Sequence, residues 1–483
     1  MDDKENLSEM IYYILGILHL ILFCWAFYNI LYFGVKPSKS LSWILITFFF
    51  PFLGAFCFII FGINRRKIKF FELKETKKRK NYIQKSFNSD KNSNITILDN
   101  IKQKKIAQLI YNNTNVIVED NNEVILLKNG EETFNAMFKA IKNAKKFIHL
   151  QYFIIENGEI LSKIIKLLEE KRKENVEVRI LYDTIGSFSL KKKTKKKLKE
   201  IGAEIYPETP FKFGSFLFSL NFRNHRKIAI IDNEIGFTGG VNISDEYITK
   251  DTDLGIWQDT HLEIKGSTVN SIHKSFLKDF YYATDQDLSK NEKYTTVTKI
   301  KGNTKLQIVS GGPDYEQSVV MQQYLSFINL AEKNICVLNP YFIPTFSILE
   351  AFKIASLSGV NVTLLLPKKS DSKIAMYSMY SYFESLLKAN VNIYLRDDFS
   401  HSKVIFIDDE IASVGSTNFD CRSFEHNYEI NAIIFDKKIT SEIRSEFDER
   451  KELATKIDLE TFRNRSIKQK TLERLCRFFS PLL

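Results

Sequence analysis

Two segments of this chain carry the same residues at the same spacing, and this duplication limits the folds open to it. In each segment a histidine is followed by a lysine after two positions, an aspartate after seven, a glycine after fourteen and an asparagine after seventeen. The chain has only seven histidines in 483 residues, so chance does not produce such a match. We expect two repeated halves, each built around one set: His225, Lys227, Asp232, Gly239 and Asn242, then His401, Lys403, Asp408, Gly415 and Asn418.

The residues after each histidine predict a short strand. Both runs, 228–231 and 404–407, are rich in β-branched side chains and end in a polar turn. Side chains two positions apart share one face of a strand, so each histidine and its lysine should point into the same space. Asp232 and Asp408 come at an odd offset and should lie in the turn, where they orient a neighbour, form an ion pair or simply fill the turn.

This set of side chains suits chemistry on a phosphodiester. Two opposed imidazoles can supply a nucleophile on one side of phosphorus and a proton donor on the other. The two lysines would hold the charge on the phosphoryl oxygens, so no metal and no cofactor is expected. The five cysteines form no C-x-x-C pair. Small residues and amides should complete the phosphate site: Gly240 and Ser416 for close backbone approach, and Asn242 and Asn418 as donors.

Strand and helix patterns alternate in the same order before each motif, which favours mixed or parallel sheets layered by helices. In the first half we expect strands at 147–155, 176–183 and 204–206, and helices at 158–173 and 191–201. In the second half we expect strands at 335–342, 360–367 and 391–395, and helices at 346–358 and 375–388. Two such lobes facing one another would bring His225 and His401 into one active site.

Two apolar segments near the N-terminus, 11–33 and 41–63, are each long enough to cross a membrane. They predict an α-helical membrane hairpin, kinked or re-entrant at Pro51. Basic residues crowd positions 65–80, whereas the loop between the segments holds only two lysines. This bias predicts a multi-pass protein of the cell membrane whose catalytic domain is cytoplasmic. The net charge of +11 then suits an anionic membrane surface, and nucleic acid is the competing partner.

The paired motifs, H-x-K-x4-D with G-G/S-x-N, resemble those of the phospholipase D superfamily. The whole chain resembles the bacterial cardiolipin synthases of that superfamily, in its two apolar segments, in 223–227, 339–344 and 418–423, and in the terminal 478–483. An N-x-E pattern follows the second motif in that superfamily, and here Asn427 and Glu429 match it. The resemblance implies that Glu429 supports a catalytic histidine. The first half departs, with Asp259-Thr260-His261 at the similar place.

The resemblance implies a membrane-bound cardiolipin synthase that passes a phosphatidyl group between two phosphatidylglycerol molecules through a phosphohistidine. His225 is our choice of nucleophile and His401 of general acid and base, and the reverse assignment stays open. The alternatives are a phospholipase D hydrolase, another phosphatidyltransferase and, more distantly, a phosphodiesterase nuclease. Nucleic acid is not an expected partner of the synthase, and the oligomeric state is left open.

The expected parts of the chain are a membrane hairpin at 1–63, a basic linker at 64–105, phospholipase D-like lobes at 106–290 and 291–450, and an amphipathic tail at 451–483. Three stretches are candidates for lipid contact. The lysine-rich 191–199 predicts either headgroup docking or a solvated helix face. The phenylalanines of 211–222 predict an interfacial loop or an acyl channel, unless they are core residues. The tail from Thr471 predicts an interfacial helix or ordinary core packing.

Overall fold

The computed structural model describes residues 2–33, 37–58, 62, 94–208, 222–249, 254–255, 257–296 and 300–483. The chain forms two compact units. One contains Met1–Lys77 and Phe211–Phe222, and the other contains Lys78–Pro210 and Arg223–Leu483. Most of the expected linker, and the phenylalanines expected at 211–218, lie outside the described residues.

The N-terminal unit contains the long helix α1 (Asp2–Phe33) and two short helices, α2 (Pro37–Phe49) and α3 (Pro51–Cys57). Within α1, Ser8–Tyr32 is the one helical segment among the described residues that is long and apolar enough to cross a membrane. The second expected span, 41–63, is not a single helix. Phe50 has φ −126° and ψ 76°, outside the helical region, because the ring of the following Pro51 disfavours helix there.

The first α-helix described in the larger unit is α5 (Ile101–Thr114), which starts inside the stretch expected to be a linker and follows the 3-10 turn η3 (Ile95–Ile97). The Asn100 side chain caps this helix by accepting from the Gln103 amide, and Ile106 and Ile110 are fully buried on one face. The elements of the first half then follow in this order: β1 (Glu119–Leu127), α6 (Gly130–Asn143), β2 (Phe147–Tyr152), α7 (Glu159–Lys173), β3 (Glu177–Tyr182), α8 (Lys192–Glu200), β4 (Glu204–Pro207), β5 (Ile228–Ile231), β6 (Ile235–Gly239), β7 (His261–Gly266) and α10 (Thr268–Thr284).

The second half repeats this order and adds a C-terminal segment. Its elements are β8 (Thr304–Gly311), α11 (Val319–Leu330), β9 (Asn334–Leu338), β10 (Phe342–Ile343), α12 (Phe346–Leu357), β11 (Asn361–Pro367), α13 (Lys373–Lys388), β12 (Asn392–Arg396), β13 (Val404–Ile407), β14 (Ile411–Gly415), β15 (Phe419–Asp420), α14 (Cys421–Glu425), β16 (Glu429–Ile434), α15 (Lys437–Glu452), β17 (Thr455–Lys456), α16 (Leu459–Arg463), α17 (Ile467–Arg477) and the 3-10 turn η7 (Ser480–Leu482). The expected strands and helices before both motifs are confirmed, with ends that differ by a few residues.

The two halves share one 15-stranded sheet. Its order is β17-β12-β11-β9-β13-β14-β16-β8-β1-β7-β6-β5-β2-β3-β4. The halves meet where β1 pairs antiparallel with β8, at Glu119 with Leu306 and Asn122 with Thr304. Outward from that pair, the strands of the first half have counterparts in the second, so that β5 corresponds to β13 and β2 to β9. The halves are therefore related by an approximate twofold axis through the β1–β8 pair.

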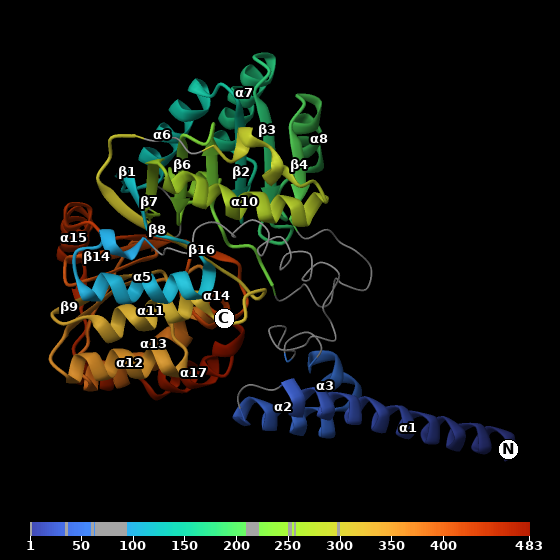
Figure 1. Cartoon of the computed structure of the whole chain (residues 1–483). Helices are drawn as coiled ribbons and strands as arrows, with labels where there is room; N and C mark the ends of the chain where they lie inside the picture. The colour runs from blue at the N-terminus through green and yellow to red at the C-terminus, as the bar shows by residue number, and fades with distance from the viewer. Residues whose placement is uncertain are drawn as a thin grey trace. The chain divides into compact units, whose positions relative to one another are not determined.

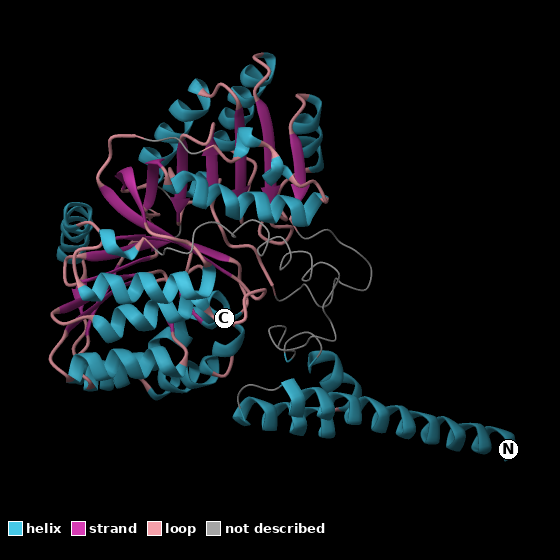
Figure 2. Cartoon of the chain, in the orientation of Figure 1, coloured by secondary structure: helices cyan, strands magenta, loops and turns pink. Residues whose placement is uncertain are grey.

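Helices cover both faces of this sheet, as Figure 2 shows. On one face α6 and α7 pack on the first half, and α5, α11, α12 and α13 pack on the second. On the other face a single apolar cluster runs through both halves and includes Phe276 and Phe447. These two residues belong to α10 and α15, the helices labelled so in Figure 1. Because this cluster also contains Ile228 of β5 and Val404 of β13, one continuous core fixes both motif strands.

Candidate active site

Each histidine lies where the parallel strands of its own half have their carboxyl ends. In the first half β5 runs antiparallel to β2, with Ile228 opposite Gln151, so the residues before β5 lie beside the end of β2. In the second half β13 pairs with β9 in the same way. Loops at this end hold side chains from several strands, as expected of a site in an α/β fold.

His225 is held by a carboxylate from the second half. Its Nδ1 lies 3.2 Å from Glu429, which also accepts a hydrogen bond from the Ser416 hydroxyl. The backbone strengthens this contact, because the His225 amide donates to the Tyr428 carbonyl over 2.9 Å. Glu429 is fully buried, so its electrostatic interaction with His225 is stronger here than it would be in water. The carboxylate holds Nδ1 as the protonated nitrogen and leaves Nε2 for chemistry.

His401 is held by a carboxylate from the first half. Its Nδ1 lies 2.8 Å from Asp259 and 3.2 Å from the Tyr247 hydroxyl. The His401 amide donates to the Gln258 carbonyl over 2.7 Å, which matches the backbone contact of the other histidine. The two pairs therefore cross between the halves, and neither half holds a complete site by itself.

The two lysines are fully buried beside their histidines. Lys227 Nζ donates to the His225 carbonyl over 2.8 Å, and Lys403 Nζ donates to the His401 carbonyl. Burial lowers the pKa of Lys227 well below its ordinary value, and the charge on Lys403 lowers it further. Burial likewise lowers the pKa of Lys403 to about 8, against the opposing effect of Asp259. The two lysines place positive charge beside the imidazoles, and an anionic phosphodiester bound there would offset it.

These charges also set the state of the imidazoles. Burial lowers the pKa of His225, and Lys227 lowers it further. Burial lowers the pKa of His401 well below its ordinary value, with both Lys403 and Lys227 adding to the effect. Burial raises the pKa of Asp259 to about 6, although nearby lysines oppose the shift. Both imidazoles are thus neutral near pH 7 before substrate binds, and a bound anion would favour protonation of one of them.

Gly240 and Ser416 occupy equivalent places against these carboxylates. A Cβ at Gly240 would lie only 2.0 Å from Asp259 Oδ1, so a larger residue would displace the carboxylate. At the equivalent place in the second half, Ser416 donates to Glu429 and accepts from the Ile430 amide. At Gly240 the group that approaches the backbone closely is therefore the Asp259 carboxylate, which belongs to the same half.

The two asparagines differ in their surroundings. Asn242 accepts from the Ile154 amide over 3.2 Å and donates to Tyr247 over 3.1 Å. Asn418 is buried, and its side-chain oxygen has no hydrogen-bond partner among the described residues. The Asn418 oxygen can thus accept a hydrogen bond from a ligand, whereas Asn242 positions the Tyr247 hydroxyl that reaches His401.

The structure does not bring Asp232 and Asp408 to the imidazoles. Each follows its motif strand in a turn at the far end of the sheet, with φ of 57° and 53°. Asp232 accepts from the amides of 145–147, and Asp408 accepts from those of 332–334 and pairs with Lys102. Grouping them with catalytic side chains was wrong in this respect, because the four-residue strand separates them from the histidines. They anchor the start of β2 and β9.

A buried arginine braces the two halves beside the site. Arg226 pairs with Asp279 of α10 and donates to the carbonyls of Gly311 and Glu429, over 3.0 and 3.2 Å. The remaining buried histidines serve the core of the first half, where His149 Nδ1 lies 2.8 Å from His273 Nε2.

Sequence reasoning did not select Asp259 or Tyr247 for the site. The place of Asp259 was visible as the departure from the N-x-E pattern, since Asp259-Thr260-His261 stands where that pattern is expected. The equivalence of Asp259 with Glu429 appears only in space, next to Gly240 and Ser416. Tyr247 has no signal in the repeat, and its role depends on the tertiary contact with His401.

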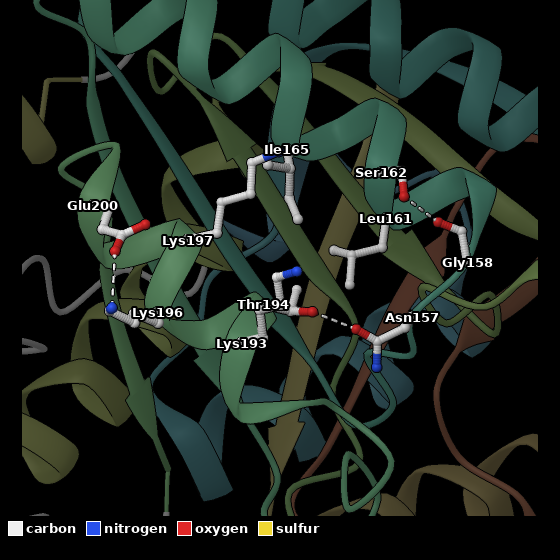
Figure 3. A pocket seen from close by; sticks show the side chains of 10 residues that line it. All are labelled: Asn157, Gly158, Leu161, Ser162, Ile165, Lys193, Thr194, Lys196, Lys197 and Glu200. Carbon is white, nitrogen blue, oxygen red and sulfur yellow. Dashed lines mark hydrogen bonds and ion pairs between the residues drawn. The ribbon is translucent and has the colours of Figure 1, made fainter.

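A cavity of about 570 Å³ lies between α7 and α8, away from the two imidazoles. Figure 3 shows the side chains that line it, including Lys193, Lys196 and Lys197, with Lys196 paired to Glu200. None of the site residues described above is in its lining. Among the described residues, no group of three or more His, Cys, Asp and Glu side chains is placed to hold a metal ion.

Comparison with known proteins places this chain in the phospholipase D superfamily. The model of the family described as "Cardiolipin synthase, PLD-like domain" matches residues 137–279 and 324–451, and that of "Phospholipase_D-nuclease N-terminal" matches 21–62. The crystal structure of phosphatidylserine synthase from Haemophilus influenzae Rd KW20 has a similar fold. It aligns with a TM-score of 0.58 and 16% identity, over 78% of this chain and 100% of that chain.

Sequence relatives show to which family of that superfamily the chain belongs. A cardiolipin synthase of Geobacillus sp. (strain WCH70) is 38% identical over 93% of this chain and 89% of its own length. A cardiolipin synthase of Clostridium perfringens is 38% identical over 93% of this chain and 95% of its own length. This chain belongs to the cardiolipin synthase family of phospholipase D-type phosphatidyltransferases. With its long apolar N-terminal helix, it is a membrane protein.

Proposed function

We propose that this enzyme makes cardiolipin and glycerol from two molecules of phosphatidylglycerol. The observation that carries the proposal is the crossed arrangement of the site, in which His225 with Glu429 and His401 with Asp259 share two buried lysines. An anionic diester fits the positive charge of Lys227 and Lys403, and both substrates reach a membrane-anchored enzyme from the bilayer.

In the first step, Nε2 of His225 attacks the phosphorus of one phosphatidylglycerol. The bond from phosphorus to the glycerol oxygen breaks, and His401, as imidazolium, gives its proton to that oxygen. Glycerol leaves and a phosphatidyl group stays on His225. Glu429 accepts the Nδ1 proton in a hydrogen bond throughout, so it stabilises the charge that develops on the His225 ring.

In the second step, His401 is neutral and removes the proton from a hydroxyl of the second phosphatidylglycerol. The hydroxyl oxygen attacks phosphorus, the bond from phosphorus to Nε2 breaks, and cardiolipin leaves. His225 is then neutral and His401 again carries the proton, as it did when the first phosphatidylglycerol was bound. Lys227, Lys403 and Asn418 hold the phosphoryl oxygens in both steps.

We propose that the catalytic unit faces the cytoplasm, which the basic residues of 65–80 support. If both apolar segments cross the membrane, or if the two together enter it and return, the N-terminus lies on the same side as the catalytic unit. If α1 alone crosses, the N-terminus lies outside. A small N-terminal tag in intact cells distinguishes the two, because an impermeant probe reaches it only in the single-pass case.

The test of the reaction uses membranes containing the enzyme and phosphatidylglycerol labelled in its phosphate. We expect cardiolipin and glycerol in equal amounts, both lost in His225→Ala and in His401→Ala. Rapid denaturation at neutral pH, followed by mass mapping, should find the label on His225. Label on His401 would reverse the two roles.

Other products would change the proposal. Phosphatidic acid in place of cardiolipin would make water the acceptor and the enzyme a hydrolase. A product containing an added alcohol would indicate another phosphatidyltransferase. Retained turnover in either histidine variant would contradict the two-histidine mechanism. Lys196→Ala, on the exposed side of α8, serves as the control for expression and membrane insertion.

A further inference from the structure

The C-terminal helix α17 is oriented with its apolar residues toward solvent. Leu475, Phe478 and Phe479 are 55, 81 and 50% exposed, and Leu472 is also exposed. Their spacing of three and four residues places them on one side of the helix. A helix that packs on a soluble core shows the opposite arrangement, so core packing does not explain this face.

The inward side of the same helix is polar. Glu473 is almost fully buried and accepts two hydrogen bonds from Arg465, at 2.9 and 2.7 Å. In the turn that follows, the Ser480 hydroxyl lies 2.7 Å from that of Ser378 and accepts from Tyr382 over 3.1 Å. These polar contacts fix the rotation of the helix on α13 and hold its apolar side outward.

The exposed side also carries positive charge. Lys468, Arg474 and Arg477 are exposed, while Glu473, the one acidic residue between 467 and 483, is paired with Arg465. An apolar stripe flanked by basic side chains is the pattern of a helix that lies in the interface of an anionic bilayer. A protein partner would not require this combination of charge and exposed phenylalanine.

The last residues of this tail contact an element that lies a few residues from the active site. The helix runs antiparallel to α13, since Arg477 stacks 4.6 Å from the Tyr382 ring and Ser480 contacts Ser378 one turn earlier in α13. The carbonyl of Leu483 then accepts from the Arg422 amide over 2.9 Å. Arg422 lies in α14, which follows Asn418 of the site by only a few residues.

We propose that 467–483 is an interfacial docking element that inserts Leu475, Phe478 and Phe479 into an anionic lipid surface and holds the active-site mouth at that surface. The partner is the bilayer that contains the substrates. Docking of 467–483 lets a lipid headgroup reach the imidazoles while the acyl chains stay in the membrane. This requires no second chain and no further protein.

The first test measures insertion of the tail in the full-length protein, reconstituted in vesicles of phosphatidylcholine and phosphatidylglycerol at a ratio of seven to three. The variant is Phe478→Trp, and the matched control is Leu357→Trp. Leu357 is 64% exposed and ends α12 at the opposite end of the sheet, near the Asp408 turn. Emission from the three native tryptophans is removed by subtracting the parent protein.

Lipids brominated on the acyl chain near the headgroup should quench the added tryptophan of Phe478→Trp by about twofold or more and leave that of Leu357→Trp unchanged. Equal quenching of the two would overturn the proposal. A tryptophan at 478 that is shielded from water yet not quenched by bromine would indicate a protein partner and would also overturn it.

The second test rests on the proposed function. The double variant Phe478→Ser, Phe479→Ser should lose about tenfold or more in turnover of vesicle substrate and keep turnover of a short-chain phosphatidylglycerol in micelles. The control is Ile354→Ser with Leu357→Ser. Equal loss on both substrates would overturn the docking role. Absence of turnover in the parent protein would defeat the proposed reaction alone, because the quenching result does not depend on it.

Discussion

Each imidazole of the site is oriented by a carboxylate from the other half of the chain. Glu429 is tied to His225 and Ser416, whereas Asp259 is tied to His401 and shares it with Tyr247. Burial would raise the pKa of Glu429, but His225 and Lys227 lower it, so this carboxylate stays ionised. The two histidines therefore have different partners, and this supports unequal roles for them in the reaction.

Removing the charge of Glu429 should slow the reaction while the fold persists. We expect Glu429→Gln to lower kcat by about two to four orders of magnitude, because the amide no longer fixes the His225 tautomer or stabilises its positive charge. The measurement is turnover of labelled phosphatidylglycerol, with a thermal melt to confirm folding. Glu410→Gln, in the turn after β13, is the control and should keep its rate. A wild-type rate in Glu429→Gln would remove this residue from the mechanism.

The pH dependence of kcat/KM should report Asp259 and Lys403, the two groups of the site whose pKa values burial shifts to about 6 and about 8. Asp259 must be ionised to hold His401, and its raised pKa of about 6 means that kcat/KM falls as the pH drops through that value. Lys403 must be charged to bind phosphate, and its lowered pKa of about 8 means that kcat/KM falls as the pH rises through that value. We expect a bell-shaped profile between these limits. Asp259→Asn should remove the acid limb that belongs to this carboxylate, and a limb unchanged in that variant would show that another group titrates there.

At the scale of the element, each motif strand separates the side chains of the candidate site from an aspartate that anchors a neighbouring strand. β5 and β13 have a histidine and lysine before them and an aspartate after them, so one short strand fixes both ends. At the far end, Asp408 anchors the start of β9 through three backbone amides and Lys102. The hydrogen bonds and the Lys102 ion pair together lower the Asp408 pKa, although burial opposes this.

Asp408→Asn should therefore affect stability and spare chemistry. We expect the free energy of unfolding to fall by about 2–4 kcal/mol, since asparagine tolerates the turn but loses the charge that the amides and Lys102 require. The lowered folded pKa means that the contribution of Asp408 is present at neutral pH and is lost as acid titrates the folded carboxylate. Chemical unfolding in detergent measures it. Asp409→Asn, the exposed neighbour, should change stability by less than about 1 kcal/mol. A large loss of kcat in folded Asp408→Asn would contradict this assignment.

The sequence allowed prediction of the elements that local pattern controls. The offsets from His225 and His401 predicted the repeat and the motif strands, and Pro51 indicated where the second apolar segment breaks. The crossing of Glu429 and Asp259 between halves could not be predicted, because spacing within one half says nothing about which half supplies a partner. Domain boundaries remain predictions, and α5 already begins inside the expected linker.

At the scale of the whole molecule, the two halves form one folding unit around a single sheet. The β1–β8 pair joins them, a shared apolar cluster lies on one face, and Arg226, which precedes β5, donates to the carbonyls of Gly311 and Glu429. This continuity could not be read from either half, since the β1–β8 pairing joins residues about 180 positions apart, such as Asn122 and Thr304. The expected lobes are thus two ends of one α/β layer system.

Because both imidazoles and both carboxylates come from one chain, the site should be complete in a single copy. We expect membranes in which His225→Ala and His401→Ala are expressed together to make no cardiolipin, although each variant keeps an intact partner motif. If the halves instead combined between chains, random dimers would contain intact sites at about one quarter of the wild-type number, and activity would recover to that level. Coexpression of wild-type with His225→Ala is the control, and its activity should follow the wild-type fraction. Recovery in the mixed variants would show that the twofold relation between the halves is used between molecules as well as within one.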